Sequence, residues 1–180
     1  PEFIDLTTLE GDGDKKLSKY LKTISEEELT EMLYAFASDD MEGRNTGDAG
    51  QKKAAAYLRD YYKEQNIVSG TKDGNYYQIV PESFFRKNSG LNASENVLAF
   101  IEGSEKPEEV LVISAHLDHV GIDQNGNIFN GADDDGSGTV AILEIAEAFN
   151  QAKEDGVGPK RSILFLHVTG EEKGLYGSKF

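Results

Sequence analysis

Three short clusters of imidazole and carboxylate side chains are the residues best suited to chemistry in this 180-residue sequence. The first is His116-Leu117-Asp118, the second is the triplet Asp133-Asp134-Asp135, and the third is the pair Glu171-Glu172. Each cluster alone has a plain interpretation: a His and an Asp that satisfy each other, a turn that caps a helix, and solvated charge. Together they offer nitrogen and oxygen ligands without thiolate, a set that suits Zn²⁺ or another divalent transition metal.

The elements around these clusters predict how they are arranged. Residues 110–114 and 162–168 are apolar runs typical of buried strands, and the first has the composition of a central strand. Between them, apolar residues at helical spacing predict a helix of about 15 residues, for which Ser137 is a plausible cap. Strand, helix and strand in this order indicate a βαβ unit with a parallel sheet that is buried on both faces.

The positions of the clusters relative to these strands predict a metal site. His116 and Asp118 follow the first strand, the Glu pair follows the second, and the Asp triplet precedes the helix. Ligands of open α/β sheets bind outside the carboxyl ends of the strands. Because so much like charge in one place is unfavourable unless a cation is present, we interpret the three clusters as parts of one metal site.

Composition excludes several other classes of function. The chain has no Cys, which excludes disulfide scaffolds, cysteine nucleophiles and thiolate zinc sites. With 18 basic and 33 acidic residues the formal charge is −15, which argues against nucleic acid or an anionic membrane as a main partner. No apolar run approaches the roughly 18 residues of a membrane span. Asp123, Asn125 and Asn127 resemble the start of an EF-hand, but Ile128 stands where that loop needs Gly.

The rest of the chain supplies the elements that frame these strands. Ser25 and Glu28 form a capping-box pattern ahead of a predicted amphipathic helix over residues 26–37. We interpret His167, in mid-strand, as a core histidine. His119 could lie near the site, but we favour a plain loop role for it. The other predicted features are a short helix near residues 17–21, a polar loop over 38–47, a helix over 49–65, strands over 76–80 and 96–101, and a hairpin turn over 124–127.

The three motifs, taken together, resemble the co-catalytic di-zinc aminopeptidase family of the zinc exopeptidase clan. The segments that carry the resemblance are His116-Leu117-Asp118, residues 131–138 and residues 170–178, and Met41-Glu42-Gly43-Arg44 also resembles bacterial members. The resemblance implies an α/β fold of three layers, with a mostly parallel mixed sheet and helices on both faces. It divides the chain into a polar lead-in over residues 1–25 and the N-terminal portion of a zinc peptidase catalytic domain over 26–180.

The resemblance also implies a role for each motif residue. His116 would bind one zinc ion, Glu172 the other, and Asp134 would bridge the two, with a cis peptide bond between Asp134 and Asp135. Asp118 would accept the free N–H of His116 and fix its tautomer. Asp133 and Asp135 are expected to be supporting residues, not ligands.

Glu171 would be the general base of this site. It would take a proton from a water that bridges the two zinc ions and pass it to the leaving amine. Neighbouring side chains of extended backbone point to opposite sides, so Glu172 can face the metal while Glu171 faces the water. The expected activity is aminopeptidase hydrolysis of peptide or protein N-termini.

Parts of the family pattern lie outside these motifs. The family has two further ligands, an Asp and a His, after the Glu-Glu motif, and this sequence continues for only eight residues past Glu172. We therefore expect a catalytic domain that is cut short, and whether the piece is active alone stays open. The sequence begins at Pro1, which suggests either an exported protein or an engineered boundary. Two alternatives stay open: a single-zinc glutaminyl cyclase that would not need His116, and a non-catalytic relative. Oligomeric state and side-chain preference are not predicted.

Overall fold

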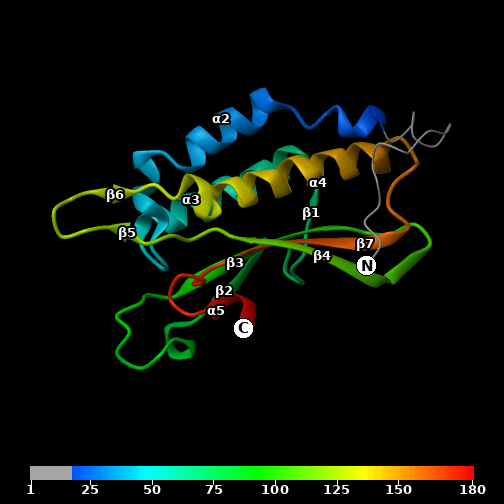
Figure 1. The fold of residues 1–180 in the computed structure, drawn as a ribbon. Coiled ribbons are helices and arrows are strands. Elements are labelled where there is room, and N and C mark those ends of the chain that lie inside the picture. The colour runs from blue at the N-terminus through cyan, green and yellow to red at the C-terminus, as the bar shows by residue number, and fades with distance from the viewer. Residues whose placement is uncertain (1–17) are drawn as a thin grey trace, which may run out of the picture.

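A computed structural model describes residues 18–180 of the chain (Figure 1). Most of the predicted lead-in, residues 1–17, lies outside the described residues. Residues 18–21 form a helical turn, which confirms the described part of the short helix expected there. None of the helices in the described part is both long enough and apolar enough to cross a lipid bilayer.

The sheet has five strands and is mixed, as predicted. Strands β1, β3, β7 and β4 lie in that order, and β2 also pairs with β3. Only β4 and β7 run parallel, with His116 opposite Val168, while the other pairings are antiparallel. The bounds are β1 (Val68–Ser69), β2 (Tyr77–Val80), β3 (Ser94–Ile101), β4 (Lys106–His116) and β7 (Arg161–Val168).

The expectation of a mostly parallel sheet is therefore wrong for these residues. The physical reason is the connection between β3 and β4, which spans only residues 102–105. A parallel neighbour needs a crossover of roughly a dozen residues or more. This short connection reverses the chain direction, and β7 then inserts between the two strands. The predicted βαβ unit is confirmed by the parallel pairing of β4 with β7 across helix α4 (Gly138–Glu154).

The helices are distributed unequally over the two faces of the sheet. Helices α2 (Glu26–Phe36), α3 (Ala49–Glu64) and α4 cover one face, whereas the four-residue α5 (Tyr176–Lys179) lies on the other side (Figure 1). Helices on both faces are thus present, but the second helical layer amounts to α5 within the described residues. A two-stranded sheet of β5 (Gly121–Ile122) and β6 (Ile128–Phe129) confirms the predicted hairpin.

The helices that frame the sheet follow their sequence signals closely. Ser25 caps α2: its hydroxyl accepts a hydrogen bond from the Glu28 amide at 3.1 Å and donates to the Glu28 carboxylate at 2.7 Å. The apolar stripe of α3 is buried at Ala54, Leu58 and Tyr62, as the spacing predicts. These side chains and those of α4 and the sheet form one continuous hydrophobic core.

Strand β4 differs from its predicted place in the sheet. Val110, Leu111 and Val112 are 49%, 52% and 50% exposed, although their unbroken apolar sequence predicts burial on both faces. The cause is that β4 is the last strand in the sheet order, so within the described residues only β7 pairs with it. The apolar run thus indicates the strand correctly but not its position in the sheet.

A buried arginine joins the N-terminal helices to the ends of the strands. The predicted loop over residues 38–47 contains a 3-10 helix, η2 (Asp39–Arg44), which ends at Arg44. The Arg44 guanidinium is fully buried and lies over the Phe36 ring, 4.6 Å from its centroid. It donates hydrogen bonds to four backbone carbonyls, those of Leu117 (3.0 Å), Phe36 (2.9 Å), Asn130 (2.6 Å) and Gly131 (2.7 Å).

Arg44 stays charged despite its burial. Desolvation lowers the pKa of Arg44 to about 10, and the nearby carboxylates of Asp118, Asp135 and Asp134 oppose that shift. The group is therefore a cation at neutral pH. Its position makes it a permanent positive charge beside the acidic clusters.

We predict that Arg44→Met destabilises the protein by at least about 3 kcal/mol, because the substitution leaves several buried carbonyl groups without donors. Urea unfolding measures this change. Arg44→Lys keeps the charge but lacks the planar fork of donors, so it should be intermediate. The matched control is Arg161→Met, because Arg161 forms an exposed ion pair with Glu109 and should change stability by less than about 1 kcal/mol. Similar losses of stability in Arg44→Met and Arg161→Met would contradict the stabilising role of the Arg44 hydrogen bonds.

His167 is a core histidine, as predicted. It is fully buried, and its Nε2 atom lies 2.7 Å from the Tyr62 hydroxyl, while Nδ1 has no hydrogen-bond partner in the described part of the chain. Burial lowers the pKa of His167 to about 3. The folded protein therefore holds this imidazole neutral at pH values where an unfolded chain protonates it.

We predict that this histidine makes folding stability sensitive to acid. The unfolded imidazole binds a proton below a pKa of about 6.5, whereas the folded one does not until about pH 3. The stability is thus complete above pH 6.5 and falls as pH decreases, by about 1.2 kcal/mol per pH unit between pH 6 and 4. Denaturant unfolding at several pH values measures the slope. In the double variant His167→Phe with Tyr62→Phe, stability should fall less steeply with pH by this amount. Equal slopes in the two proteins would disprove the assignment of the acid sensitivity to His167.

Candidate metal centre

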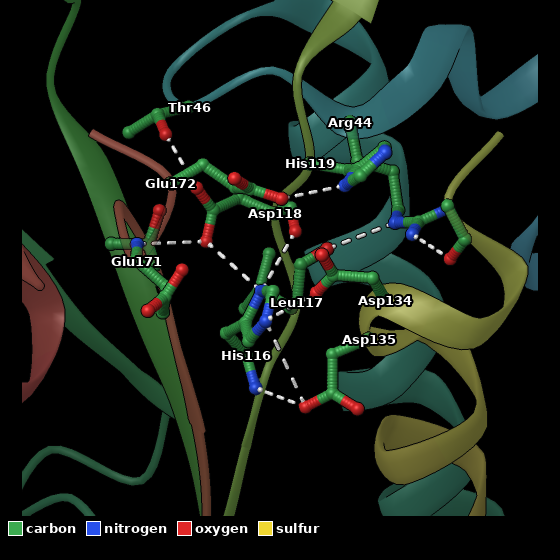
Figure 2. Close-up of polar contacts among 12 residues, drawn as sticks. Arg44, Thr46, His116, Leu117, Asp118, His119, Asp134, Asp135, Glu171 and Glu172 are labelled. Atoms are coloured by element: carbon green, nitrogen blue, oxygen red, sulfur yellow. Dashed lines mark hydrogen bonds and ion pairs between the residues drawn. The ribbon is translucent and has the colours of Figure 1, made fainter. Parts of the chain in front are cut away.

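The three acidic and imidazole clusters meet at one edge of the sheet (Figure 2). His116 ends β4, Asp134 lies in the irregular turn η4 (Ala132–Ser137), and Glu172 lies in the turn that follows β7. One ligand atom each from His119, Asp134 and Glu172 lie within 4.8 Å of one another. The predicted convergence at the carboxyl ends of parallel strands is therefore present.

His116 points its Nε2 atom at the acidic triplet. This atom lies 3.0 Å from Asp134 Oδ1, and the Nδ1 atom lies 3.0 Å from the backbone carbonyl of Asp118. Because a carbonyl only accepts, Nδ1 is the donor and carries a proton. In a neutral ring the Nε2 lone pair then faces a carboxylate, an arrangement that a cation or a second proton on the ring would stabilise.

The Asp118 carboxylate has a different partner from the expected one. It lies 3.9 Å from His116 Nδ1, beyond hydrogen-bond distance, and the tautomer of His116 is held instead by the Asp118 carbonyl. The carboxylate is fully buried and accepts hydrogen bonds from the Thr46 hydroxyl (2.7 Å) and the Glu171 amide (3.1 Å). Desolvation raises its pKa, and these two donors oppose that shift. Asp118 thus connects the first motif to the third.

The members of the acidic triplet make different contacts. The peptide bond between Asp134 and Asp135 is cis, as the resemblance implies. The Asp135 carboxylate accepts from the His116 amide (3.1 Å) and from the Gly138 amide (3.2 Å), so it supports both β4 and the start of α4. Ser137 is not a side-chain cap, because its hydroxyl donates to the Asp133 carbonyl (3.1 Å). The Asp134 side chain, which contacts His116 Nε2, is 68% exposed.

Glu171 and Glu172 present their carboxylates in different directions (Figure 2). The predicted cause, extended backbone, is wrong. The two residues lie in a turn, in which the Glu171 carbonyl accepts a hydrogen bond from the Gly174 amide at 2.9 Å. The Glu172 carboxylate faces His119. The Glu171 carboxylate has no hydrogen-bond partner among residues 18–180, so it is free to accept a proton from another molecule.

His119 is a site residue for which the sequence analysis favoured the other of two interpretations. Its predicted loop role is wrong, since its Nδ1 atom lies 2.7 Å from Glu172 Oε1 and its side chain is only 15% exposed. The available signal was position: His119 follows Asp118 directly, at the carboxyl end of β4. A residue in a loop has no periodicity to indicate which way its side chain points.

The donor set fits a divalent transition metal. The set provides imidazole nitrogen from His116 and carboxylate oxygens from Asp134 and Glu172. Asp134 lies between the other two, since it contacts His116 at 3.0 Å and has a ligand atom within 4.8 Å of one of Glu172. Two carboxylates and two imidazoles without a basic side chain paired to them favour the binding of a cation. Arg44, the nearest buried cation, donates to carbonyls and not to these carboxylates.

Comparison with known proteins agrees with this arrangement. Residues 96–180 match the family model described as Peptidase family M28. A probable zinc metalloprotease of Pyrenophora tritici-repentis is 41% identical over 139 residues, which are 74% of this chain and 26% of that protein. Carboxypeptidase Q of Xenopus laevis is 39% identical over 85 residues, 47% of this chain and 16% of that protein.

Solved structures share the fold. The LapA aminopeptidase of Legionella pneumophila has a TM-score of 0.65 at 23% identity, over 94% of this chain and 41% of that one. Porphyromonas gingivalis glutaminyl cyclase has a TM-score of 0.59 at 19% identity, over 81% of this chain and 45% of that one. The chain thus spans less than half the length of these relatives. The match of residues 96–180 covers the strands and turns that carry His116, Asp134 and Glu172, and it identifies this part of the chain as a segment of peptidase family M28.

Proposed function

We propose that this chain is part of a zinc-dependent metallopeptidase that acts as an aminopeptidase. The observation that carries the proposal is the position of Asp134, which contacts His116 on one side and groups with Glu172 on the other. The relatives named as zinc metalloproteases support zinc as the metal. The carboxypeptidase and aminopeptidase names among the relatives support peptides as substrates.

The proposed ligands are His116 for one ion, Glu172 for a second, and Asp134 shared between them. The lone pair that His116 Nε2 directs at Asp134 supports this assignment, because the Asp118 carbonyl holds the ring proton on Nδ1. The two further ligands implied by the family resemblance, an Asp and a His, come after Glu172 in the family, and residues 173–180 contain neither. They remain a prediction about the complete protein.

The chemistry follows from what each residue can do. Zinc, when bound, lowers the pKa of water and polarises the scissile carbonyl. Glu171 then accepts a proton from the attacking water and returns it to the leaving amine. Its carboxylate has no competing partner among the described residues, and the bond from its amide to Asp118 fixes its backbone beside the ligands. Water supplies the hydroxyl of the new carboxyl group and, through Glu171, the proton of the new amine.

Selectivity for a free N-terminus is the finer part of the proposal. An α-ammonium group would find the exposed Asp134 carboxylate and the acidic surroundings of the site favourable. The proposal also includes export of the protein, to the periplasm, the surface or the medium. A solved neighbour of this fold is named a leucine aminopeptidase precursor. Fractionation of cells that express the native gene tests export, and recovery in the cytoplasm alone would reject it.

The alternatives differ in what they require of the site. A single-zinc glutaminyl cyclase would not need His116, yet the Nε2 atom of His116 faces Asp134 at 3.0 Å. A non-catalytic relative would not need a free carboxylate at Glu171. The metal-facing His116 and the unpaired Glu171 together favour the peptidase.

We predict that Glu171→Gln abolishes hydrolysis and retains zinc. The amide keeps the size of the side chain but cannot accept the proton, so kcat in the intact protein should fall about 10²- to 10⁴-fold with little change in KM. Release of the first residue from a peptide, followed by mass spectrometry, measures the rate. Zinc content is measured in parallel by elemental analysis.

Two controls separate a metal ligand from a base and test selectivity for a free N-terminus. His116→Ala should lose zinc as well as activity, which separates a ligand from a base. A peptide with an acetylated N-terminus should resist cleavage, while one with an amidated C-terminus should not. Substantial turnover by Glu171→Gln would reject the base, and equal cleavage of acetylated peptide would reject aminopeptidase selectivity. A product 17 mass units lighter from a Gln-initiated peptide, without cleavage, would favour the cyclase, since cyclisation releases ammonia.

A further inference from the structure

We propose that His119 is a positioning residue for Glu172. Its imidazole donates a hydrogen bond from Nδ1 to Glu172 Oε1 and thereby fixes the carboxylate so that its other oxygen is available to a metal ion. The inference rests on the proposed function, because it takes Glu172 as a ligand. Ligating carboxylates are commonly held by such outer hydrogen bonds, and loss of one weakens metal binding.

The hydrogen bond itself is short and shielded. Nδ1 of His119 and Oε1 of Glu172 are 2.7 Å apart, within the range of charge-assisted bonds. An ionised carboxylate can only accept, so the imidazole is the donor. The two side chains are 15% and 19% exposed. Water therefore competes little for either partner, and the bond can hold the carboxylate in one orientation.

The backbone of His119 is anchored to the N-terminal part of the chain. Its amide donates to the Arg44 carbonyl at 3.1 Å, and His119 forms a parallel bridge with Asn45. These contacts join the loop after β4 to the segment that the buried guanidinium holds. The Cα atom of His119 is consequently fixed by main-chain bonds that do not depend on the imidazole.

The imidazole ring is fixed by close packing against Gly131. A Cβ atom on Gly131 would lie 2.5 Å from His119 Cγ, 2.6 Å from His119 Cδ2 and 2.6 Å from the Asp134 carbonyl oxygen, so no side chain fits there without a shift of the ring and of that backbone. Gly131 has a φ of +55°, a left-handed conformation that also favours glycine. The Arg44 guanidinium holds the Gly131 carbonyl at 2.7 Å. The ring thus rests against a backbone that is itself clamped.

The distance between the two atoms favours positioning over direct ligation. Two ligand atoms on one tetrahedral zinc ion lie about 3.3 Å apart, given metal–ligand bonds of about 2.0–2.1 Å. Nδ1 of His119 and Oε1 of Glu172 are 2.7 Å apart, which is a hydrogen-bond distance. These two atoms are therefore placed as the donor and the acceptor of one hydrogen bond. His119 acts through Glu172.

The test compares two substitutions of nearly the same shape. Asn and Leu both branch at Cγ, but only Asn offers an N–H near the position of Nδ1. Zinc affinity is measured with Zn²⁺ alone, by competition with a chromogenic chelator. We expect His119→Leu to bind zinc about 10- to 100-fold more weakly, and His119→Asn to keep most of the affinity. The rescue by Asn is a result that loss of packing would not give.

The controls separate this inference from the proposed function. Val120→Ala, at the neighbouring exposed position, should bind zinc as the unmodified chain does, and Asp134→Ala should lose zinc. Circular dichroism and thermal unfolding without metal check that each variant folds. If His119→Leu does not fold, His119→Ala, which removes the donor without adding bulk, replaces it and should weaken zinc binding similarly.

Each contrary outcome is informative. Unchanged zinc affinity in His119→Leu, or in His119→Ala where it replaces that variant, overturns the inference. If Asp134→Ala still loses zinc, the proposed function survives. Affinity lost equally in His119→Asn and His119→Leu would make His119 a ligand or a packing residue and also overturns it. Failure of the unmodified chain to bind zinc would reject the inference and the metal site together.

Discussion

The buried guanidinium of Arg44 is the contact on which the site depends. Its four carbonyl partners come from the end of α2, the end of β4 and the segment before η4, so a single side chain fixes three parts of the chain that are distant in sequence. An arginine can do this because its planar fork provides several donors at fixed angles. The loops that carry His119 and Gly131 are held in place by their hydrogen bonds to Arg44.

Asp118 also joins separate parts of the chain, and its partners include the proposed site residues His116 and Glu171. Its carboxylate joins Thr46 to the Glu171 amide, and its carbonyl sets the tautomer of His116. One residue thus orients a proposed ligand and the proposed base through different atoms. Because both contacts come from a residue that is fully buried, the fold itself sets the relative placement of His116 and Glu171, the proposed ligand and the proposed base.

The sequence was sufficient to predict the βαβ unit and the meeting of the three motifs, because periodicity reports which residues are buried and strand ends are easy to find. It did not predict that β4 lies at the edge of the sheet, since an apolar run indicates burial without naming what covers it. The importance of Arg44 and His119 was also hidden. Arg44 ends the short helix η2 and His119 lies in a loop, and each acts through contacts with carbonyls or carboxylates that are distant in sequence. No local pattern encodes those contacts.

The choice of partners for Arg44 explains how a cation and a metal site can coexist. If the guanidinium paired with Asp134 or Glu172, it would satisfy the carboxylate and compete with a metal ion. It donates to carbonyl oxygens instead, so its charge lowers the repulsion among the acids at a distance while their oxygens stay free. The carboxylates of Asp134 and Glu172 thus stay unpaired with the guanidinium, and the 68% exposed Asp134 side chain remains accessible to the proposed metal ion.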